Sequence, residues 1–77
     1  MDSIAIAGAS GLVGEELISL LKQSENPPKK IELISRNHNY NFKGVDIVFL
    51  CTPASVAKII APLAIAQGAI VIDLSSA

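Results

Sequence analysis

The sequence has 77 residues, which is the length of one small domain, and its formal net charge is only −1 at pH 7. That charge excludes the basic field of a nucleic-acid-binding surface. The single cysteine excludes an internal disulfide and, by itself, a zinc site, and it favours a reducing, cytoplasmic setting.

No membrane span is expected, although residues 54–72 form a long apolar region. Four residues interrupt this region: Lys58, Pro62, Gln67 and Gly68. Residues 1–3 carry no positive charge, and the apolar run behind them soon meets glycines, so no signal peptide is expected either.

The segment I-A-I-A-G-A-S-G-L-V-G-E-E, residues 4–16, predicts a buried strand over residues 3–7, a glycine turn and a helix N-terminus. Its G-x-x-G-x-x-G spacing is a variant of the dinucleotide fingerprint. Gly8 can turn without a Cβ penalty, Gly11 can leave room for a ligand, and Gly14 can let helix pack on strand. Backbone N–H groups and the helix dipole would then bind a phosphate, the alternative being a turn that serves packing alone.

A helix is predicted over residues 12–24, and Asn26-Pro27-Pro28 stops it. Five residues fall at helical spacing: Val13, Leu17, Leu20, Leu21 and Ser24. Glu15 and Glu16 lie in its first turns, where the helix dipole favours acids, and we expect both to be solvated surface residues.

The next predicted strand covers residues 31–34 and ends at Ser35-Arg36-Asn37. In a dinucleotide-binding fold this tip reaches the adenine ribose, where an acid suits NAD and an arginine suits the 2′-phosphate of NADP. No acid stands there, and Arg36 offers a planar fork that matches phosphate, with Asn37 able to donate beside it. The tip therefore favours NADP over NAD, the alternative being a loop arginine in water.

The lone His38 has no second ligand in view, so no metal site is assigned. Residues 47–51 form an apolar run typical of a central parallel strand, followed by Thr52-Pro53 at the edge where such sheets bind ligands. We interpret Cys51 as a small apolar residue near the end of this strand rather than as a nucleophile.

A second helix is predicted with Ser55 as its cap and Gly68 as its end, and Pro62 kinks it or starts another short helix. Five residues fall at helical spacing: Val56, Ile59, Ile60, Leu63 and Gln67. Residues 69–74 form the fourth strand.

Strands that alternate with helices predict an α/β fold with a parallel sheet. Residues 36–44 are too few for a crossover helix but can reach past the first strand, because nine residues span about 30 Å. The predicted strand order is thus 2-1-3-4, with one helix on each face. The glycine turn and Thr52-Pro53 then share one crevice, and part of the sheet stays uncovered.

The chain as a whole resembles the N-terminal NAD(P)-binding part of the aspartate-semialdehyde dehydrogenase family. The matching pieces are I-A-I-A-G-A-S-G-L-V-G-E-E-L, I-S-R-N, F-K-G-V-D-I-V-F-L and A-P-L-A-I-A-Q-G-A-I-V-I-D-L-S-S-A. The N-acetyl-γ-glutamyl-phosphate reductases are similar in the same places, but the closing S-S-A favours the aspartate family.

This resemblance implies a partial Rossmann-like domain over residues 1–77 that binds NADP, with NAD the less favoured cofactor. It implies an enzyme that converts β-aspartyl phosphate to the semialdehyde through a cysteine thiolate, with a histidine as acid and base. It implies that Ser10, Gly11, Leu12 and Val13 bind the diphosphate, that Arg36 and Asn37 bind the 2′-phosphate, and that Thr52, Pro53 and Ser75 lie along the nicotinamide half.

Two departures from the family pattern bear on function. The family's connection between the arginine and F-K-G-V-D is longer than the four residues 38–41 found here. Cys51 and His38 match neither catalytic position of the family, so the chain by itself is expected to have no catalytic residues. Its partners would be the dinucleotide and its missing catalytic domain, or another chain that covers the sheet. A non-enzymatic module that binds a nucleotide or a partner, or a remnant without a ligand, remains an alternative.

Overall fold

The computed structural model describes residues 3–8, 11–34 and 40–74. The described residues form four strands and two helices in the order β1 (Ser3–Ala7), α1 (Leu12–Gln23), β2 (Lys30–Ile34), β3 (Ile47–Leu50), α2 (Ala54–Ala66) and β4 (Ile70–Asp73). All six elements are those that the sequence predicts, with ends that differ by no more than one residue except at the start of α2.

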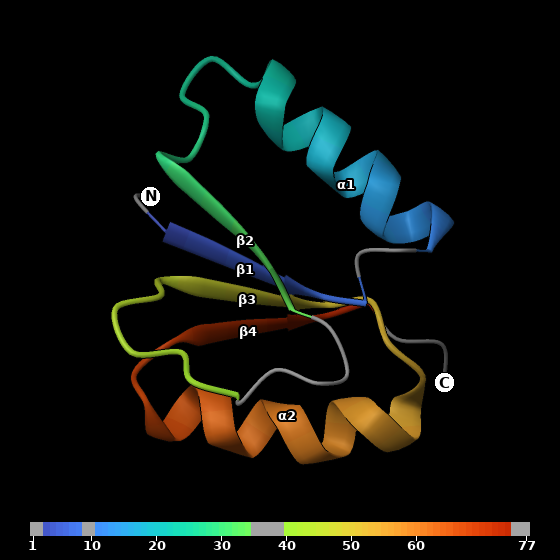
Figure 1. Ribbon diagram of the computed structural model, residues 1–77, viewed down its shortest axis with the longest axis vertical. Coiled ribbons are helices and arrows are strands. Elements are labelled where there is room, and N and C mark those ends of the chain that lie inside the picture. The colour runs from blue at the N-terminus through green and yellow to red at the C-terminus, as the bar shows by residue number, and fades with distance from the viewer. Residues whose placement is uncertain (1–2, 9–10, 35–39, 75–77) are drawn as a thin grey trace.

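The strands form one parallel sheet in the order β2-β1-β3-β4, which confirms the predicted topology. Ile6 of β1 lies level with Leu33 of β2 and with Phe49 of β3, so these three side chains share one face of the sheet. Figure 1 shows α1 on one side of the sheet and α2 on the other. The fold is a small Rossmann-like α/β sandwich, as predicted.

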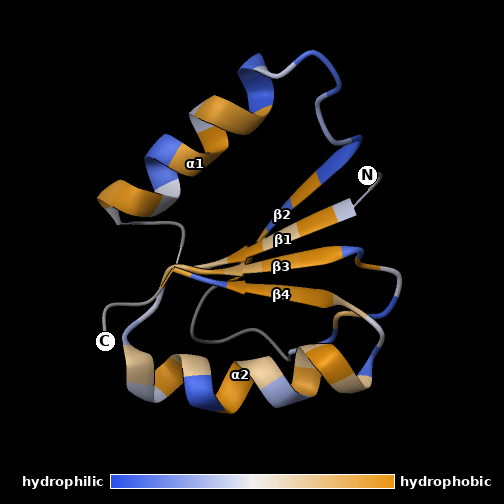
Figure 2. Cartoon of the chain, turned by 180° about the vertical axis from the view of Figure 1, so that it is seen from behind, coloured by the Kyte–Doolittle hydropathy of each residue, from blue (hydrophilic) through white to orange (hydrophobic). Residues whose placement is uncertain are grey.

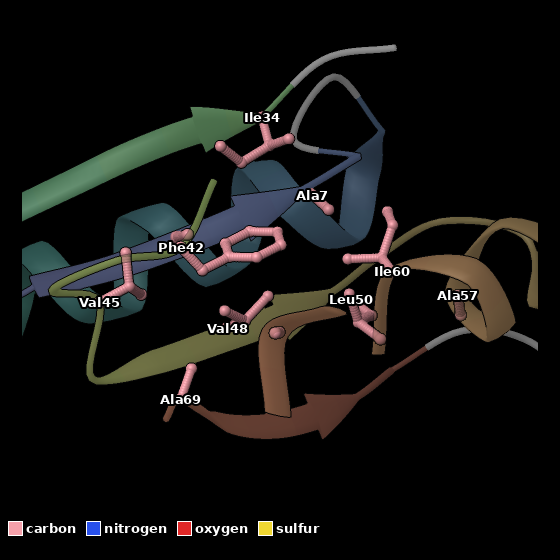
Figure 3. Packing of buried hydrophobic residues seen from close by; sticks show 11 residues of the cluster. Ala7, Ile34, Phe42, Val45, Val48, Leu50, Ala57, Ile60 and Ala69 are labelled. Carbon is pink, nitrogen blue, oxygen red and sulfur yellow. The ribbon is translucent and has the colours of Figure 1, made fainter. Parts of the chain in front are cut away.

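The face of the sheet beneath α2 carries the larger buried cluster. From α2, Ala57, Ile60 and Ala64 pack towards β3 and β4. Among the described residues no helix covers the half of this face formed by β1 and β2. Residues 40–46, the described part of the connection before β3, cover it instead. Phe42, which is fully buried, and Val45 pack in one cluster with residues of both strands, as Figure 3 shows. Burial of one such aromatic side chain stabilises the fold by roughly 1.5–3 kcal/mol.

The opposite face is only half covered. Ile4, Ile6 and Phe49 are buried there beneath the partly buried side of α1. Ile70 and Ile72 of β4 lie level with Ile47 and Phe49 on this same face, yet they are 65% and 37% exposed. The prediction that one helix per face leaves part of the sheet bare is therefore right for the α1 face, whereas the connection before β3 closes the other face.

Helical spacing identified both helices but misplaced their buried sides. In α1 the partly buried side is formed by Leu17, Ile18 and Leu21, while Val13 and Leu20 are 53% and 66% exposed. In α2 the predicted Ile59 and Leu63 are exposed, and two alanines pack in their place beside Ile60. The reason is that both helices are apolar over more than one side, so spacing alone does not determine which side faces the sheet.

The start of α2 also differs from prediction. Its N-cap is Pro53, whose carbonyl accepts from the N–H groups of Val56 and Ala57, and Ser55 lies within the first turn rather than capping it. Pro62 lies inside one continuous helix and does not begin a second one. Gly68, at φ +92°, follows the end of the helix as predicted.

The Gln67 side chain fixes the connection before β3 to the end of α2. Its Oε1 accepts from the Phe42 N–H at 2.8 Å, and its Nε2 donates to the carbonyls of Tyr40 and Leu63, both at 3.1 Å. Tyr40 and Phe42 stack with their ring centroids 6.4 Å apart. One amide thus supplies partners for the backbone of a segment that has neither helix nor strand.

Candidate functional site

Gly8 lies where the carboxyl ends of three strands meet. Its φ is +79°, and its N–H donates to the carbonyl of Ile34 at the end of β2 at 3.4 Å. A Cβ at Gly8 would lie 2.7 Å from the carbonyl oxygen of Cys51, just after β3. Only glycine fits this conformation and this approach together, so the turn is held between β2 and β3.

Gly11 ends the same turn and lies directly before α1. It is the N-cap, its N–H donates to the Gly8 carbonyl at 3.4 Å, and its carbonyl accepts from the Glu15 N–H at 3.0 Å. Among the described residues, a Cβ there would come within 4 Å of one atom, the Gly8 carbonyl oxygen at 3.9 Å. The first N–H groups of α1 have no carbonyl within the helix to bind, and they lie beside this open position.

The first two residues of α1 are apolar and exposed, with Leu12 at 82% and Val13 at 53%. Gly14 by contrast is buried in the helix. The role of Gly14 in close packing of helix on strand stays a prediction. The start of α1 therefore offers backbone donors flanked by two apolar side chains.

Thr52 lies against this turn, and Pro53 follows it as the N-cap of α2. The Cys51 N–H donates to the Ala7 carbonyl at 2.9 Å, and the Thr52 methyl carbon is 3.1 Å from the position of a Cβ on Gly8. Because Pro53 caps α2, both helices begin at this edge of the sheet, as Figure 1 shows. The N-terminal ends of two helix dipoles therefore lie at the edge that carries the glycine turn.

Four residues predicted for this site lie outside the described residues: Ser10, Arg36, Asn37 and Ser75. Their neighbours show where the chain leads. The Gly8 bond to Ile34 brings the end of β2 to the glycine turn, and the Leu74 N–H donates to the Leu50 carbonyl at 2.8 Å at the end of β4. Ile34 and Leu74, the last described residues before Arg36 and Ser75, thus both lie at the carboxyl edge of the sheet.

Cys51 does not have the surroundings of an activated nucleophile. It is partly buried beside Ile6 and Phe49 on the α1 face, and burial raises the pKa of its thiol. Because its pKa is raised, the thiol stays in its protonated, unreactive form. This agrees with the interpretation of Cys51 as a small apolar residue rather than a nucleophile. Glu15 and Glu16 are exposed as expected. Across residues 3–8, 11–34 and 40–74 no three metal-ligating side chains gather into a group that could hold an ion.

These features are those of a dinucleotide site: a glycine turn and a helix N-terminus at the ends of β1 and β3, between which the strand order reverses. The residues fit such a ligand, because the space that a Cβ would fill at Gly11 is left open. Neither described helix has the length and apolarity needed to cross a membrane.

Residues 29–77 match the family model described as "Semialdehyde dehydrogenase, NAD binding domain". The aspartate-semialdehyde dehydrogenase of Rickettsia typhi is 32% identical over 93 aligned residues, which include 96% of this chain and 28% of the relative. That of Campylobacter jejuni is 33% identical over 95% of this chain and 27% of the relative. The "USG-1 protein homolog" of Pseudomonas aeruginosa is 29% identical over 97% and 28%.

The chain thus spans little more than a quarter of the length of these relatives. The alignments extend over 93 or 94 positions, more than the 77 residues of this chain, so each relative has positions that this chain lacks. The family model covers more than half of the chain, including the end of β2, Thr52-Pro53 and β4. The chain belongs to the NAD-binding domains of the semialdehyde dehydrogenase family.

Proposed function

We propose that the chain is the NADP-binding portion of an aspartate-semialdehyde dehydrogenase, the enzyme that reduces β-aspartyl phosphate to aspartate semialdehyde with loss of phosphate. The observation that carries the proposal is the fit of Gly8 between the ends of β2 and β3, with the Gly11 N–H at the start of α1 bonded to the Gly8 carbonyl. The relatives that bear this enzyme's name match almost the whole chain.

In this proposal the diphosphate binds at the start of α1. Ser10, Gly11, Leu12 and Val13 supply backbone N–H groups, and the helix dipole adds roughly half a positive charge at this end. Gly11 keeps the approach open because a side chain there would stand between ligand and backbone. The exposed Leu12 and Val13 exclude water from one side of the bound group.

Arg36 and Asn37 bind the adenosine 2′-phosphate. The support is their place two and three residues beyond Ile34, whose carbonyl is bonded to the glycine turn. A guanidinium offers two parallel donors to a phosphate, and the extra phosphate is what distinguishes NADP from NAD.

Thr52, Pro53 and Ser75 lie along the nicotinamide half, which supplies the hydride when bound. Catalysis needs groups that this chain does not provide, because the Cys51 thiol is desolvated and held by the sheet. We therefore assign the chain binding and orientation of the dinucleotide, and we assign the cysteine and histidine of the reaction to a catalytic domain beyond it.

Two alternatives keep the same fold. An N-acetyl-γ-glutamyl-phosphate reductase would use the same cofactor site with another acyl phosphate. A non-enzymatic module is favoured by one specific observation, the alignment positions that the relatives have and this chain lacks. If these positions form part of the adenine-binding wall, cofactor affinity is lost while the fold is kept.

Calorimetric titration of the 77-residue chain with NADPH and with NADH tests the proposal. We expect binding that prefers NADPH, and Arg36→Ala should remove this preference while leaving weak binding of both. Lys22→Ala is the matched control, because Lys22 is an exposed cation in the last turn of α1, at the end remote from Gly11. A folded chain that binds neither nucleotide contradicts the cofactor proposal and favours the non-enzymatic module.

A further inference from the structure

The helix α1 packs on the sheet much less closely than α2 does. Of its 12 residues, the one that is buried is Gly14, which has no side chain to pack. Leu17, Ile18 and Leu21 contact the sheet but stay only partly buried. By contrast α2, which has 13 residues, buries three side chains against the sheet. Figure 2 shows apolar and hydrophilic stretches in alternation along α1, as in a helix with one side on the sheet and the other in water.

Hydrogen bonds add little to the attachment of α1. Among the described residues, one hydrogen bond joins the start of α1 to the chain before it, from the Gly11 N–H to the Gly8 carbonyl. Its length of 3.4 Å exceeds the usual range of N–H···O bonds. At the other end of the helix, the Ser24 hydroxyl donates at 2.8 Å to the Leu21 carbonyl of the same helix. Apolar contacts of three partly buried side chains therefore supply most of the attachment.

A helix attached in this way has low local stability. Isolated helices shorter than about 12–15 residues are marginal in water, so the stability of α1 depends on its packing. Elements with few buried apolar contacts open at a lower free energy than the rest of a fold. The connection from α1 to β2 restrains the helix little, because residues 24–27 are exposed. We therefore expect α1 to leave the sheet and fray before the rest of the fold unfolds.

The proposed diphosphate site lies at the N-terminus of this loosely packed helix. Its backbone donors and the positive end of its dipole are in place only while α1 is helical and docked beside the glycine turn. We propose, on the basis of the function proposed above, that docking of α1 and binding of the dinucleotide are coupled. The apparent affinity is the intrinsic affinity multiplied by the fraction of chains in which α1 is docked, and bound dinucleotide increases that fraction.

Hydrogen exchange of the full chain, followed by NMR, tests the docking equilibrium. In the free chain, the amide protons of residues 16–23 in α1 should be protected at least about tenfold less than those of residues 58–66 in α2. Saturating NADPH should raise the protection of α1 towards that of α2. The proposal is overturned if α1 is as well protected as α2 in the free chain, or if bound NADPH leaves the exchange of α1 unchanged.

Two adjacent leucines provide a matched pair of variants for the coupling. Leu21 packs against the sheet, whereas Leu20 is 66% exposed. Both lie roughly 12 Å or more along the helix axis from its first residue, so neither reaches a diphosphate bound there. Calorimetric titration should show that Leu21→Ala weakens NADPH binding at least about threefold, because fewer chains have α1 docked. Leu20→Ala makes the same change of side chain away from the sheet and should leave the affinity as it is.

The outcomes separate this proposal from the function on which it rests. Circular dichroism checks that both leucine variants remain folded. If both bind NADPH as tightly as wild type does, the coupling is overturned while the cofactor function stands. If the folded wild-type chain binds no nucleotide, the cofactor function is contradicted, and the coupling is overturned with it.

Discussion

Gly8 satisfies two constraints at once, a left-handed backbone and a backbone carbonyl at contact distance. Gly44 satisfies only the first, because its φ is +82° but no atom lies within 4 Å of a Cβ built there. A comparison of Gly8 with Gly44 therefore separates the effect of a left-handed backbone from the effect of steric exclusion. The turn can be recognised from the glycine spacing alone, but the reason that Gly8 is irreplaceable lies in a strand more than forty residues further along the chain.

Replacement of Gly8 and of Gly44 by alanine, one at a time, measures how the cost in stability differs between the two positions. Gly44→Ala should lower the free energy of unfolding by about 1–2 kcal/mol through backbone strain. Gly8→Ala should lower it by a further ~1–3 kcal/mol, because the methyl group would press on the Cys51 carbonyl. Urea unfolding followed by circular dichroism gives both values. Equal losses at the two positions would contradict the close approach of Gly8 to β3.

The Cys51 thiol provides a second prediction at this scale. Burial raises its pKa, so the folded state favours the protonated form. The stabilising contribution is fully present below the pKa of the unfolded thiol and is lost as the pH rises through the folded pKa. Wild type should therefore lose stability relative to Cys51→Ala as the pH rises above the thiol's usual range.

Thiol labelling tests the same point directly. The folded chain should react with a disulfide reagent more slowly than the chain in urea, and the midpoint of its rate against pH should lie higher. Fast labelling of the folded chain near neutral pH would show an activated cysteine, and the assignment of catalysis to another domain would then need revision.

At the scale of elements, the connection before β3 takes the place of a helix. Phe42 and Val45 cover β1 and β2, and Gln67 holds this segment through two hydrogen bonds, to the Phe42 N–H and the Tyr40 carbonyl, while a third bond ties the same amide to Leu63 of α2. The short connection is thus a packed part of the fold. The sequence predicts its reach but not its packing, because two aromatic residues in a short polar segment show no periodicity that would reveal which face they cover.

The substitution Gln67→Glu tests how much the hydrogen bonds of the Gln67 side chain stabilise the fold. The variant keeps an acceptor for the Phe42 N–H but loses both donors and places a carboxylate beside carbonyl oxygens. We expect the free energy of unfolding to fall by about 1–3 kcal/mol. Gln23→Glu is the matched control, because Gln23 also ends a helix but its amide donates only to the exposed Ser19 hydroxyl. Similar small losses in the free energy of unfolding for both variants would show that the Gln67 hydrogen bonds contribute little.

At the scale of the whole molecule, the chain is small and part of its sheet is uncovered. Ile70 and Ile72 line the bare half of the α1 face, where they are 65% and 37% exposed. A domain of this size has little stability in reserve, so ligands and partners that bind the folded state should stabilise it measurably.

NADPH should therefore raise the thermal midpoint of unfolding. At a free concentration one hundred times Kd the gain is about 2.7 kcal/mol, which corresponds to roughly 10–20 °C for a domain of this length. NADH at the same concentration should give a smaller shift, and Gly8→Ala should abolish both shifts by displacing the turn. Scanning calorimetry measures each case. Equal shifts with the two nucleotides would contradict the proposed role of Arg36.

The sequence by itself determined the six elements and the strand order, and it predicts a site at the ends of β1 and β3. These follow from local signals, since apolar runs, glycine spacing and short connections restrict a parallel sheet to few topologies. Tertiary structure alone decided which side of each helix is buried, what covers β1 and β2, and why Gly8 cannot be replaced. These features depend on contacts between residues far apart in the chain, where packing rather than local preference determines the outcome.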